Sequence, residues 1–336
     1  MNVEVVPPII RKIQRTGTVS LSITLPKQWI STHNLRQGQE LLLSRAENGD
    51  LIIHAPHPTE PEKEEKMKNI SLQELDNEQL IQSLVSTYLK GYKIIHITSD
   101  SPIPSQMLRN IEKIVENFIG LEIVENTMHE VIIHDLSQPP VEDMNRFIKR
   151  MNKIVLEMLH GVIEGFDTKT SDHMADVTRQ EHSVDKLYYM LSRQLRGILQ
   201  DLTVPDILDF SLSNIIDVER IIKRLEGLAD HCNRLAKIVL ADPDLHIPDL
   251  PDEFMETARN LETLFRDTMR AFFLKDAILA SNLIAKSHKQ RSWVWNQILS
   301  FKFEENLSIL YNFLRLLERV ANYIADIGEA TINLYS

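Results

Sequence analysis

Residues 223–236 read KRLEGLADHCNRLA, and residues 315–328 read RLLERVANYIADIG. The second segment repeats the pattern of the first 92 positions further along the chain. The aligned pairs are Lys223 and Arg315, Leu225 and Leu317, Glu226 and Glu318, and Ala229 and Ala321. A repeat at this spacing within a helical region indicates two tandem bundles of three helices, each of which ends in the same kind of helix.

The helical pattern around this repeat extends from residue 141 to residue 336. Breaks divide it into about six helices, and they fall at residues 166–171, 203–205, 242–251, 274–276 and 301–303. Long helices joined by short connections are typical of up-and-down bundles. We therefore predict an all-α C-terminal region over residues 141–336, with three-helix repeats at about 141–240 and 252–336.

The part of the chain before this region mixes helix and strand patterns. Residues 68–138 predict a small α/β sandwich. Its expected helices lie near 80–89 and 104–119, and its expected strands lie at 94–97, 121–124 and 131–133. This sandwich contains no Gly-rich nucleotide loop and no nucleophile elbow. A charged run, EPEKEEK at 60–66, follows Pro56 and Pro58, so residues 57–67 are interpreted as a linker.

The N-terminal segment has the pattern of a small β module. Apolar side chains alternate with polar ones from Thr18 to Leu25, which predicts a half-buried strand. Pro26 then begins a helical turn in which Trp29 and Ile30 are expected to face inward. Gly38 precedes a second predicted strand, and the turn that follows this strand predicts a hairpin. These last elements are the strand at 40–43, the turn Asn48-Gly49-Asp50 and the strand at 51–53.

The net charge of the 336-residue chain is −11, but the charge is unevenly distributed. Between Ile9 and Gln39 there is no acidic residue, and the basic residues are Arg11, Lys12, Arg15, Lys27 and Arg36. Because DNA responds to local charge, the acidic whole does not exclude DNA binding by this segment.

The cysteine content and the hydropathy pattern bear on where the chain acts. The single cysteine, Cys232, cannot form an intramolecular disulfide. The N-terminal residues do not read as a signal peptide, and no apolar run is long enough to cross a membrane. We therefore expect a cytoplasmic protein without membrane insertion.

The order of elements in the N-terminal module resembles the AbrB/SpoVT-type swapped-hairpin DNA-binding domain over about residues 9–55. We assign this module to residues 1–56. The resemblance implies an interleaved homodimer that contacts DNA through Arg11, Lys12 and Arg15, with Lys27 as a weaker candidate. Such cations would neutralise DNA phosphates. The alternative for this module is a dimerisation unit or an antitoxin-like partner of another protein.

Helical geometry groups the acidic side chains of the C-terminal region. Glu219, Glu226 and Asp230 share one helix face, and Glu181 and Asp185 lie one turn apart on an earlier helix. Carboxylates that project from neighbouring helices are ligands suited to iron, manganese, magnesium, calcium or zinc. The alternative is ordinary solvent-exposed ion pairing of Glu226 with Lys223 or Arg224.

These acidic motifs resemble the PhoU family over about residues 141–336. Glu226 and Asp230 match the E-x-x-x-D signature of that family, and Glu181 and Asp185 match the acidic segment that precedes it. The resemblance implies a divalent or ferric ion (Fe, Zn, Mn or Mg), for which Glu318 is a further candidate ligand. The second repeat departs from the pattern, because Asn322 replaces an acid and His288 aligns with another. The first repeat is the better candidate for a metal site.

These resemblances imply a DNA-binding transcriptional regulator of phosphate uptake, with a PhoU-like sensor half. One alternative is an adaptor that does not bind DNA and that modulates a phosphate ABC transporter through its ATPase subunit, or a sensor kinase. An enzyme alternative is a carboxylate-bridged di-iron oxidase. Such enzymes use paired Glu-x-x-His motifs, and we expect no Glu-x-x-His motif among the bundle helices. We therefore predict a protein that is not an enzyme.

Overall fold

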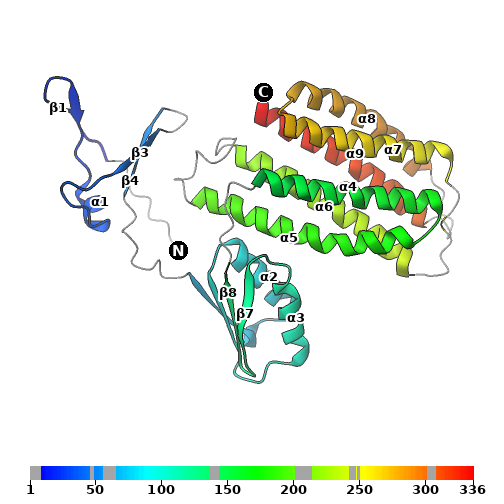
Figure 1. Ribbon diagram of the computed structural model, residues 1–336, viewed down its shortest axis with the longest axis horizontal. Helices are drawn as coiled ribbons and strands as arrows, with labels where there is room; N and C mark the ends of the chain where they lie inside the picture. The colour runs from blue at the N-terminus through cyan, green and yellow to red at the C-terminus, as the bar shows by residue number, and fades with distance from the viewer. Residues whose placement is uncertain are drawn as a thin grey trace. The chain divides into compact units, whose positions relative to one another are not determined.

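The computed structural model describes residues 9–45, 49–55, 66–136, 144–200, 214–241, 247, 250–300 and 308–336. The chain divides into two compact units, Met1–Glu65 and Lys66–Ser336. Figure 1 shows their helices and strands in chain order. Within the described ranges, no helix is both long enough and apolar enough to cross a membrane.

The described residues of the first unit form two antiparallel strand pairs and one short helix. Strands β1 (Gln14–Thr16) and β2 (Ser20–Ser22) form one pair, and β3 (Leu42–Arg45) and β4 (Leu51–His54) form the other. Helix α1 (Lys27–Thr32) begins directly after Pro26, as the sequence predicts. The pairing of β3 with β4 confirms the predicted hairpin, in which Gly49 adopts a φ of 89°. Asn48 of the predicted turn lies outside the described residues.

The prediction of a half-buried strand over residues 18–25 is wrong for this unit taken by itself. Its strand β2 covers only Ser20–Ser22, and the side chains of Val19, Leu21 and Ile23 are 92%, 68% and 53% exposed. Among the described residues of the unit, none is buried. The physical reason is size, because a chain segment this short has too few side chains to cover its own apolar face.

The second unit begins with a four-stranded sheet in the order β5-β6-β8-β7. Its strands are β5 (Met67–Ser71), β6 (Ile94–Thr98), β7 (Leu121–Asn126) and β8 (Glu130–Asp135). Strand β5 runs parallel to β6, whereas β8 is antiparallel to both β6 and β7. A short 3₁₀ turn, η1 (Leu72–Glu74), follows β5. The sheet contains the three predicted strands, and β5 is an additional strand whose first residue, Met67, falls in the predicted linker.

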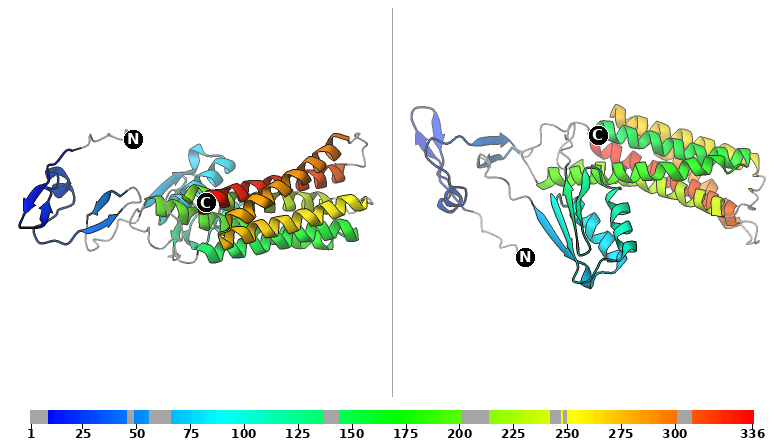
Figure 2. Two further views of the ribbon diagram at one scale, coloured as in Figure 1. Left: turned by 90° about the horizontal axis from the view of Figure 1, so that it is seen from above. Right: turned by 60° about the horizontal axis from the view of Figure 1, so that its bottom comes forward.

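Helices α2 (Asn77–Leu89) and α3 (Ser105–Val115) lie on the same side of this sheet (Figure 2). A capping box starts α2: Gln79 N donates to Asp76 Oδ1 at 2.8 Å, and Asp76 N donates to Gln79 Oε1 at 3.0 Å. The reciprocal bonds satisfy backbone donors that a helix start leaves free. Leu80 and Leu84 of α2 are buried with the sheet residues, so the helix closes one core of this unit.

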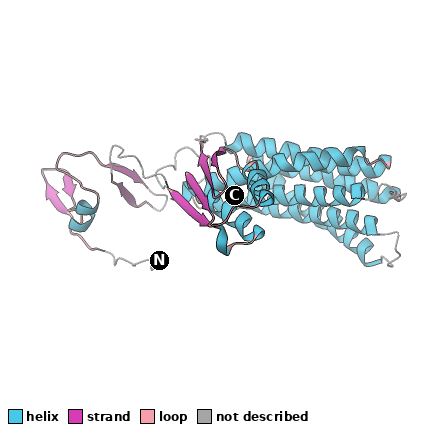
Figure 3. Cartoon of the chain, turned by 90° about the horizontal axis from the view of Figure 1, so that it is seen from below, coloured by secondary structure: helices cyan, strands magenta, loops and turns pink. Residues whose placement is uncertain are grey.

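In the rest of the unit, the described residues form six long helices, which Figure 3 shows in a bundle. They are α4 (Met144–Thr168), α5 (Asp172–Gln200), α6 (Ile215–Ala241), α7 (Asp252–Leu274), α8 (Ala277–Ser300) and α9 (Ser308–Tyr335). Helices α4, α5 and α6 pack on one another, as do α7, α8 and α9. Helix α6 also packs on α9, so one hydrophobic core spans both groups. The prediction of a bundle of six long helices is confirmed.

The sheet is attached to the bundle by contacts with α5. Arg193 on α5 forms an ion pair with Asp135 on β8, whose side chain is fully buried. Lys93 Nζ contacts the same carboxylate at 2.9 Å. The ring of Phe118 also packs edge-on against Tyr189, with ring centroids 5.2 Å apart. The ion pairs to this buried carboxylate are costly to break, because the loss of a cation leaves a desolvated negative charge.

Candidate metal centre

Helices α5 and α6 together present three carboxylates to one point. Glu181 and Asp185 come from consecutive turns of α5, and Asp230 comes from α6. One oxygen from each side chain lies within 4.8 Å of the others. The four-residue spacing puts both α5 acids on the face that packs against α6. The structure therefore brings together three of the five predicted metal ligands.

Mutual repulsion and partial burial make this cluster costly when it is fully ionised. Burial is the main cause that raises the pKa of Asp185 to about 7, and the charges of Glu181, Asp230 and Glu226 add to it. Burial also raises the pKa of Asp230. Carboxylates that repel one another in this way gain stability from a bound proton or from a metal cation.

Glu226 lies close enough to the cluster to raise the pKa of Asp185, but its own carboxylate forms an ion pair with a lysine. Lys223 Nζ donates to both Glu226 oxygens, at 3.0 and 2.8 Å. The same ammonium group lies 4.7 Å from the centre of the Tyr188 ring. Burial raises the pKa of Glu226, and the hydrogen bond from Lys223 opposes that rise. Lys223 thus supplies a cation beside the acidic cluster, a pairing that the sequence offered only as an alternative to metal binding.

Glu318, the fifth predicted ligand, lies apart from the triad and forms an ion pair with Arg315. Asn322, which aligns with Asp230, accepts a hydrogen bond from Arg291 Nη1 at 3.2 Å. The side chain of His288 is exposed. In the second repeat, therefore, guanidinium groups contact the side chains that align with the metal candidates of the first.

A Glu-x-x-His motif does occur in the bundle, at Glu157 and His160 on α4, so the expectation that the bundle helices contain none is wrong. His160 Nδ1 lies 3.5 Å from Glu262 Oε1 on α7. Glu157 accepts a hydrogen bond from Gln180 at 3.3 Å. Neither residue belongs to the acidic triad.

The predicted DNA-binding residues lie in the first unit, and all four are exposed: Arg11, Lys12, Arg15 and Lys27. Arg15 Nη2 donates to the carbonyl oxygen of Thr18 at 2.7 Å, which holds the guanidinium over the β1–β2 turn. Lys27 is the first residue of α1. Exposure leaves these cations available to a polyanion.

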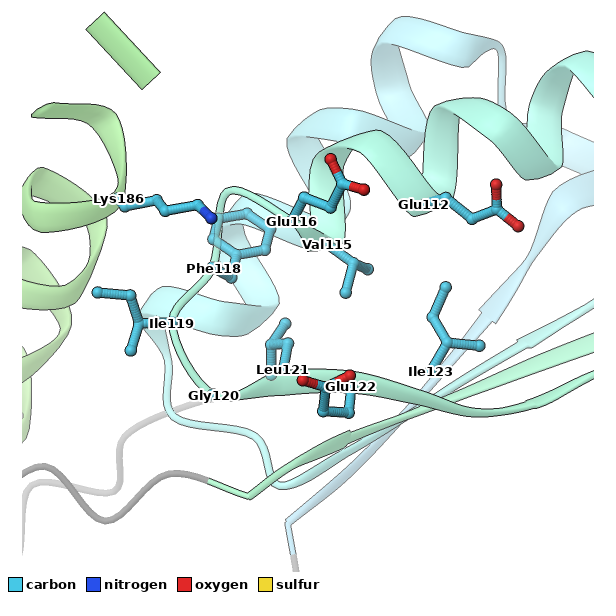
Figure 4. A pocket seen from close by; sticks show the side chains of 10 residues that line it. All are labelled: Glu112, Val115, Glu116, Phe118, Ile119, Gly120, Leu121, Glu122, Ile123 and Lys186. Carbon is cyan, nitrogen blue, oxygen red and sulfur yellow. The ribbon is translucent and has the colours of Figure 1, made fainter. Parts of the chain in front are cut away.

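A cavity of about 450 Å³, which the sequence did not predict, lies where α3 and β7 approach α5. Figure 4 shows the side chains that line it, with Lys186 extending from α5 toward Glu116 at the end of α3. Three of its lining side chains are acidic: Glu112, Glu116 and Glu122. Sequence periodicity does not reveal this hollow, because its walls come from elements that meet only in the folded chain.

Two family matches agree with this architecture. Residues 148–239 match the PhoU domain, and residues 14–66 match the family described as antidote-toxin recognition MazE, bacterial antitoxin. The chain therefore carries a PhoU domain in its helical part and a MazE/AbrB-type antitoxin-like domain in its first unit. The two family resemblances found in the sequence are confirmed.

Individual relatives match more than half of the chain. A curated protein of Borreliella burgdorferi, named phosphate-specific transport system accessory protein PhoU homolog, is 26% identical over an alignment of 204 residues, which covers 56% of this chain and 90% of that protein. The crystal structure of the phosphate transport system regulatory protein PhoU from Streptococcus pneumoniae is 18% identical, with a TM-score of 0.49 over 57% of this chain and 93% of the other. For PhoU from Pseudomonas aeruginosa, the identity is 16% and the TM-score is 0.47, over 57% and 95%.

Proposed function

We propose that this chain is a DNA-binding transcriptional regulator of phosphate uptake whose PhoU domain binds a metal ion. One observation carries the proposal: a MazE/AbrB-type domain with exposed basic residues is joined in one chain to a PhoU domain with a cluster of three carboxylates. The proposed protein acts in the cytoplasm and is not an enzyme.

The proposed DNA contacts are made by Arg11, Lys12 and Arg15, with Lys27 in a lesser role. Their exposure and the absence of acids between Ile9 and Gln39 support this assignment. Phosphate contacts of this kind position a protein on a duplex and make its binding depend steeply on salt.

The proposed DNA-binding form is a homodimer with interleaved hairpins. Support comes from Val19, Leu21 and Leu42, which are 92%, 68% and 62% exposed in the single chain. A second copy of the same module would bury these apolar side chains, as small domains require.

The proposed metal ligands are Glu181, Asp185 and Asp230, with Glu226 as a further ligand if Lys223 is displaced. Oxygen ligands suit a divalent or ferric ion such as Fe, Mn or Mg, and Zn accepts them also. The bound ion would neutralise the repulsion that raises the pKa of Asp185. Glu318 is left out of this set, because Arg315 already neutralises it.

We assign the proposed roles to four segments of the chain. Residues 1–56 form the DNA-binding and dimerisation module, 57–67 the linker, 68–138 the α/β domain, and 141–336 the PhoU-like domain. Metal or partner binding can alter DNA binding only if it favours one arrangement of the dimer over another.

Fluorescence anisotropy with a labelled random-sequence duplex tests DNA binding by the full chain. The double variant Arg11→Gln/Arg15→Gln is expected to bind more weakly and to reduce the slope of log K against log salt by about 1 for each phosphate that is no longer neutralised. Arg45→Gln is the matched control, since Arg45 is an exposed cation of β3 in the same unit. Unchanged binding by the double variant would reject this interface.

A second candidate function is an adaptor that acts on a phosphate ABC transporter or on a sensor kinase through protein contacts. The name of the Borreliella burgdorferi relative, a transport accessory protein, favours it, and that relative covers 56% of this chain. The two candidates differ in promoter occupancy. Chromatin immunoprecipitation from phosphate-replete and phosphate-starved cells should enrich promoters if the chain regulates transcription, and should enrich none if it is only an adaptor.

A further inference from the structure

Helices α6 and α9 carry the two copies of the sequence repeat, and one end of their contact is electrically balanced. Arg220 Nη2 on α6 donates to Asp326 Oδ1 at 3.1 Å and to Glu329 Oε2 at 2.9 Å on α9. Arg224 Nε lies 2.7 Å from Asp326 Oδ2. Two guanidinium groups therefore face two carboxylates.

The repeat relates these side chains to a second set on the same two helices, at the other end of their contact, where the charges are not balanced. Shifting each position by 92 places Arg234 where Asp326 stands and Lys237 where Glu329 stands. Asn312 and Leu316 take the places of Arg220 and Arg224. The helix contact itself is preserved, because His231 and its repeat partner Tyr323 meet, with Nε2 and Oη 3.2 Å apart. Cations have replaced both acids at the second end.

A cavity of about 180 Å³ lies at this unbalanced end. The polar side chains that line it are His231, Arg234, Tyr311, Asn312, Arg315 and Arg319. Arg315 shares its charge with Glu318. Arg234 and Arg319 are exposed, and neither forms an ion pair within the part of the chain that the structure describes. The cavity thus collects more positive charge than its described surroundings neutralise.

We propose that this cavity binds a phosphoryl oxyanion, held by the guanidinium groups of Arg234, Arg315 and Arg319. Guanidinium is planar and donates paired hydrogen bonds that match phosphate oxygens. The cavity volume of about 180 Å³ is many times the roughly 10–15 Å³ that one water molecule needs, so it accommodates inorganic phosphate or the terminal phosphate of a nucleotide. A cation would be repelled here, and an apolar ligand would have to desolvate three charges.

Isothermal titration calorimetry of the full chain with inorganic phosphate, at constant ionic strength in chloride, tests this proposal. We expect saturable binding. Arg319→Gln should weaken it about tenfold, the loss expected for a charged hydrogen bond. Arg234→Asp restores the acid of the balanced end and should abolish binding. Titration with ATP in a parallel arm tells whether the phosphoryl group comes free or on a nucleotide.

The matched control is Arg270→Gln, which removes an exposed arginine of α7 outside the cavity and should leave phosphate binding unchanged. Both cavity residues are exposed, so we expect the variants to keep the helical circular dichroism spectrum of the parent chain. If a cavity variant does unfold, Arg319→Lys serves in its place. It keeps the positive charge but loses the paired donors of the guanidinium group, and it should still weaken phosphate binding. No saturable binding of phosphate or ATP, or equal losses in Arg270→Gln and Arg319→Gln, would overturn the proposal.

Discussion

Asp185 of α5 and Asp230 of α6 bring carboxylate oxygens within 4.8 Å of each other, and Glu181 joins them at the same point. Burial and these neighbours hold the pKa of Asp185 at about 7, against an ordinary value of 3.8. An acid whose pKa is raised by folding is protonated in the native state while it is already ionised in the unfolded chain. Native stability that depends on this proton is lost as pH rises from about 4 to 7.

Replacing Asp185 by Asn removes this pH dependence. With a chelator present, the melting temperature of the parent chain should fall between pH 5 and 7 more steeply than that of Asp185→Asn. Above pH 7 the variant should be the more stable of the two. Scanning fluorimetry across this pH range measures the difference. Asp176→Asn, at an exposed position of the same helix, is the control and should follow the parent curve.

Metal ions are expected to stabilise the parent chain through the same carboxylates. At a concentration of Mn²⁺ or Zn²⁺ about 100 times Kd, binding to the native state alone adds about 2.7 kcal/mol to the free energy of unfolding. Asp230→Asn should lose this gain, and chelator should reverse it. Glu318→Gln should retain the metal-dependent shift, because Glu318 lies on α9, outside the triad, and pairs with Arg315. Equal loss in both variants would place the metal elsewhere.

Lys223→Gln releases Glu226 from its ammonium partner. The change adds negative charge beside the cluster, so the metal-free chain should be less stable and its metal affinity should rise several-fold. Calorimetric titration with Mn²⁺ measures the affinity. Lys186→Gln is a suitable comparison, because it removes a lysine of α5 that lines the separate cavity of Figure 4. Tighter binding in both variants would indicate a general charge effect and not release of Glu226.

Gly328→Ala should destabilise the α8–α9 contact. A Cβ at this position would lie 2.6 Å from Ile284 Cγ1 and 3.0 Å from its Cδ1, so the branched side chain must shift. Overpacking costs about 1–3 kcal/mol, whereas the gain in helix propensity is about 1 kcal/mol. Urea denaturation should therefore show a net loss. Gly197→Ala is the control, since nothing lies within 4 Å of a Cβ there, and it should stabilise the chain slightly.

The sequence predicted the helical part best, because its signals are local and regular. Apolar residues of α6 such as Leu225 and Cys232 recur at helical spacing, and they are buried in the structure. The strand β5 was missed for the opposite reason. Only Ile70 of its five residues is buried, and its pairing with β6 depends on residues that lie far along the chain. Its sequence therefore carries no alternating pattern to recognise.

The sequence by itself determined which acids share a helix face, because the positions of Glu181, Asp185, Glu226 and Asp230 follow from the pitch of the helix. Only the tertiary structure decided which of them meet. The packing of α5 on α6 joins three carboxylates, whereas Glu226 pairs with Lys223 and Glu318 with Arg315 three residues away on the same helix. The packing of α6 on α9 places Arg234 and Arg319 in one cavity. The acids of the triad and the arginines of the cavity lie on different helices, and their distances are set by packing that no local pattern encodes.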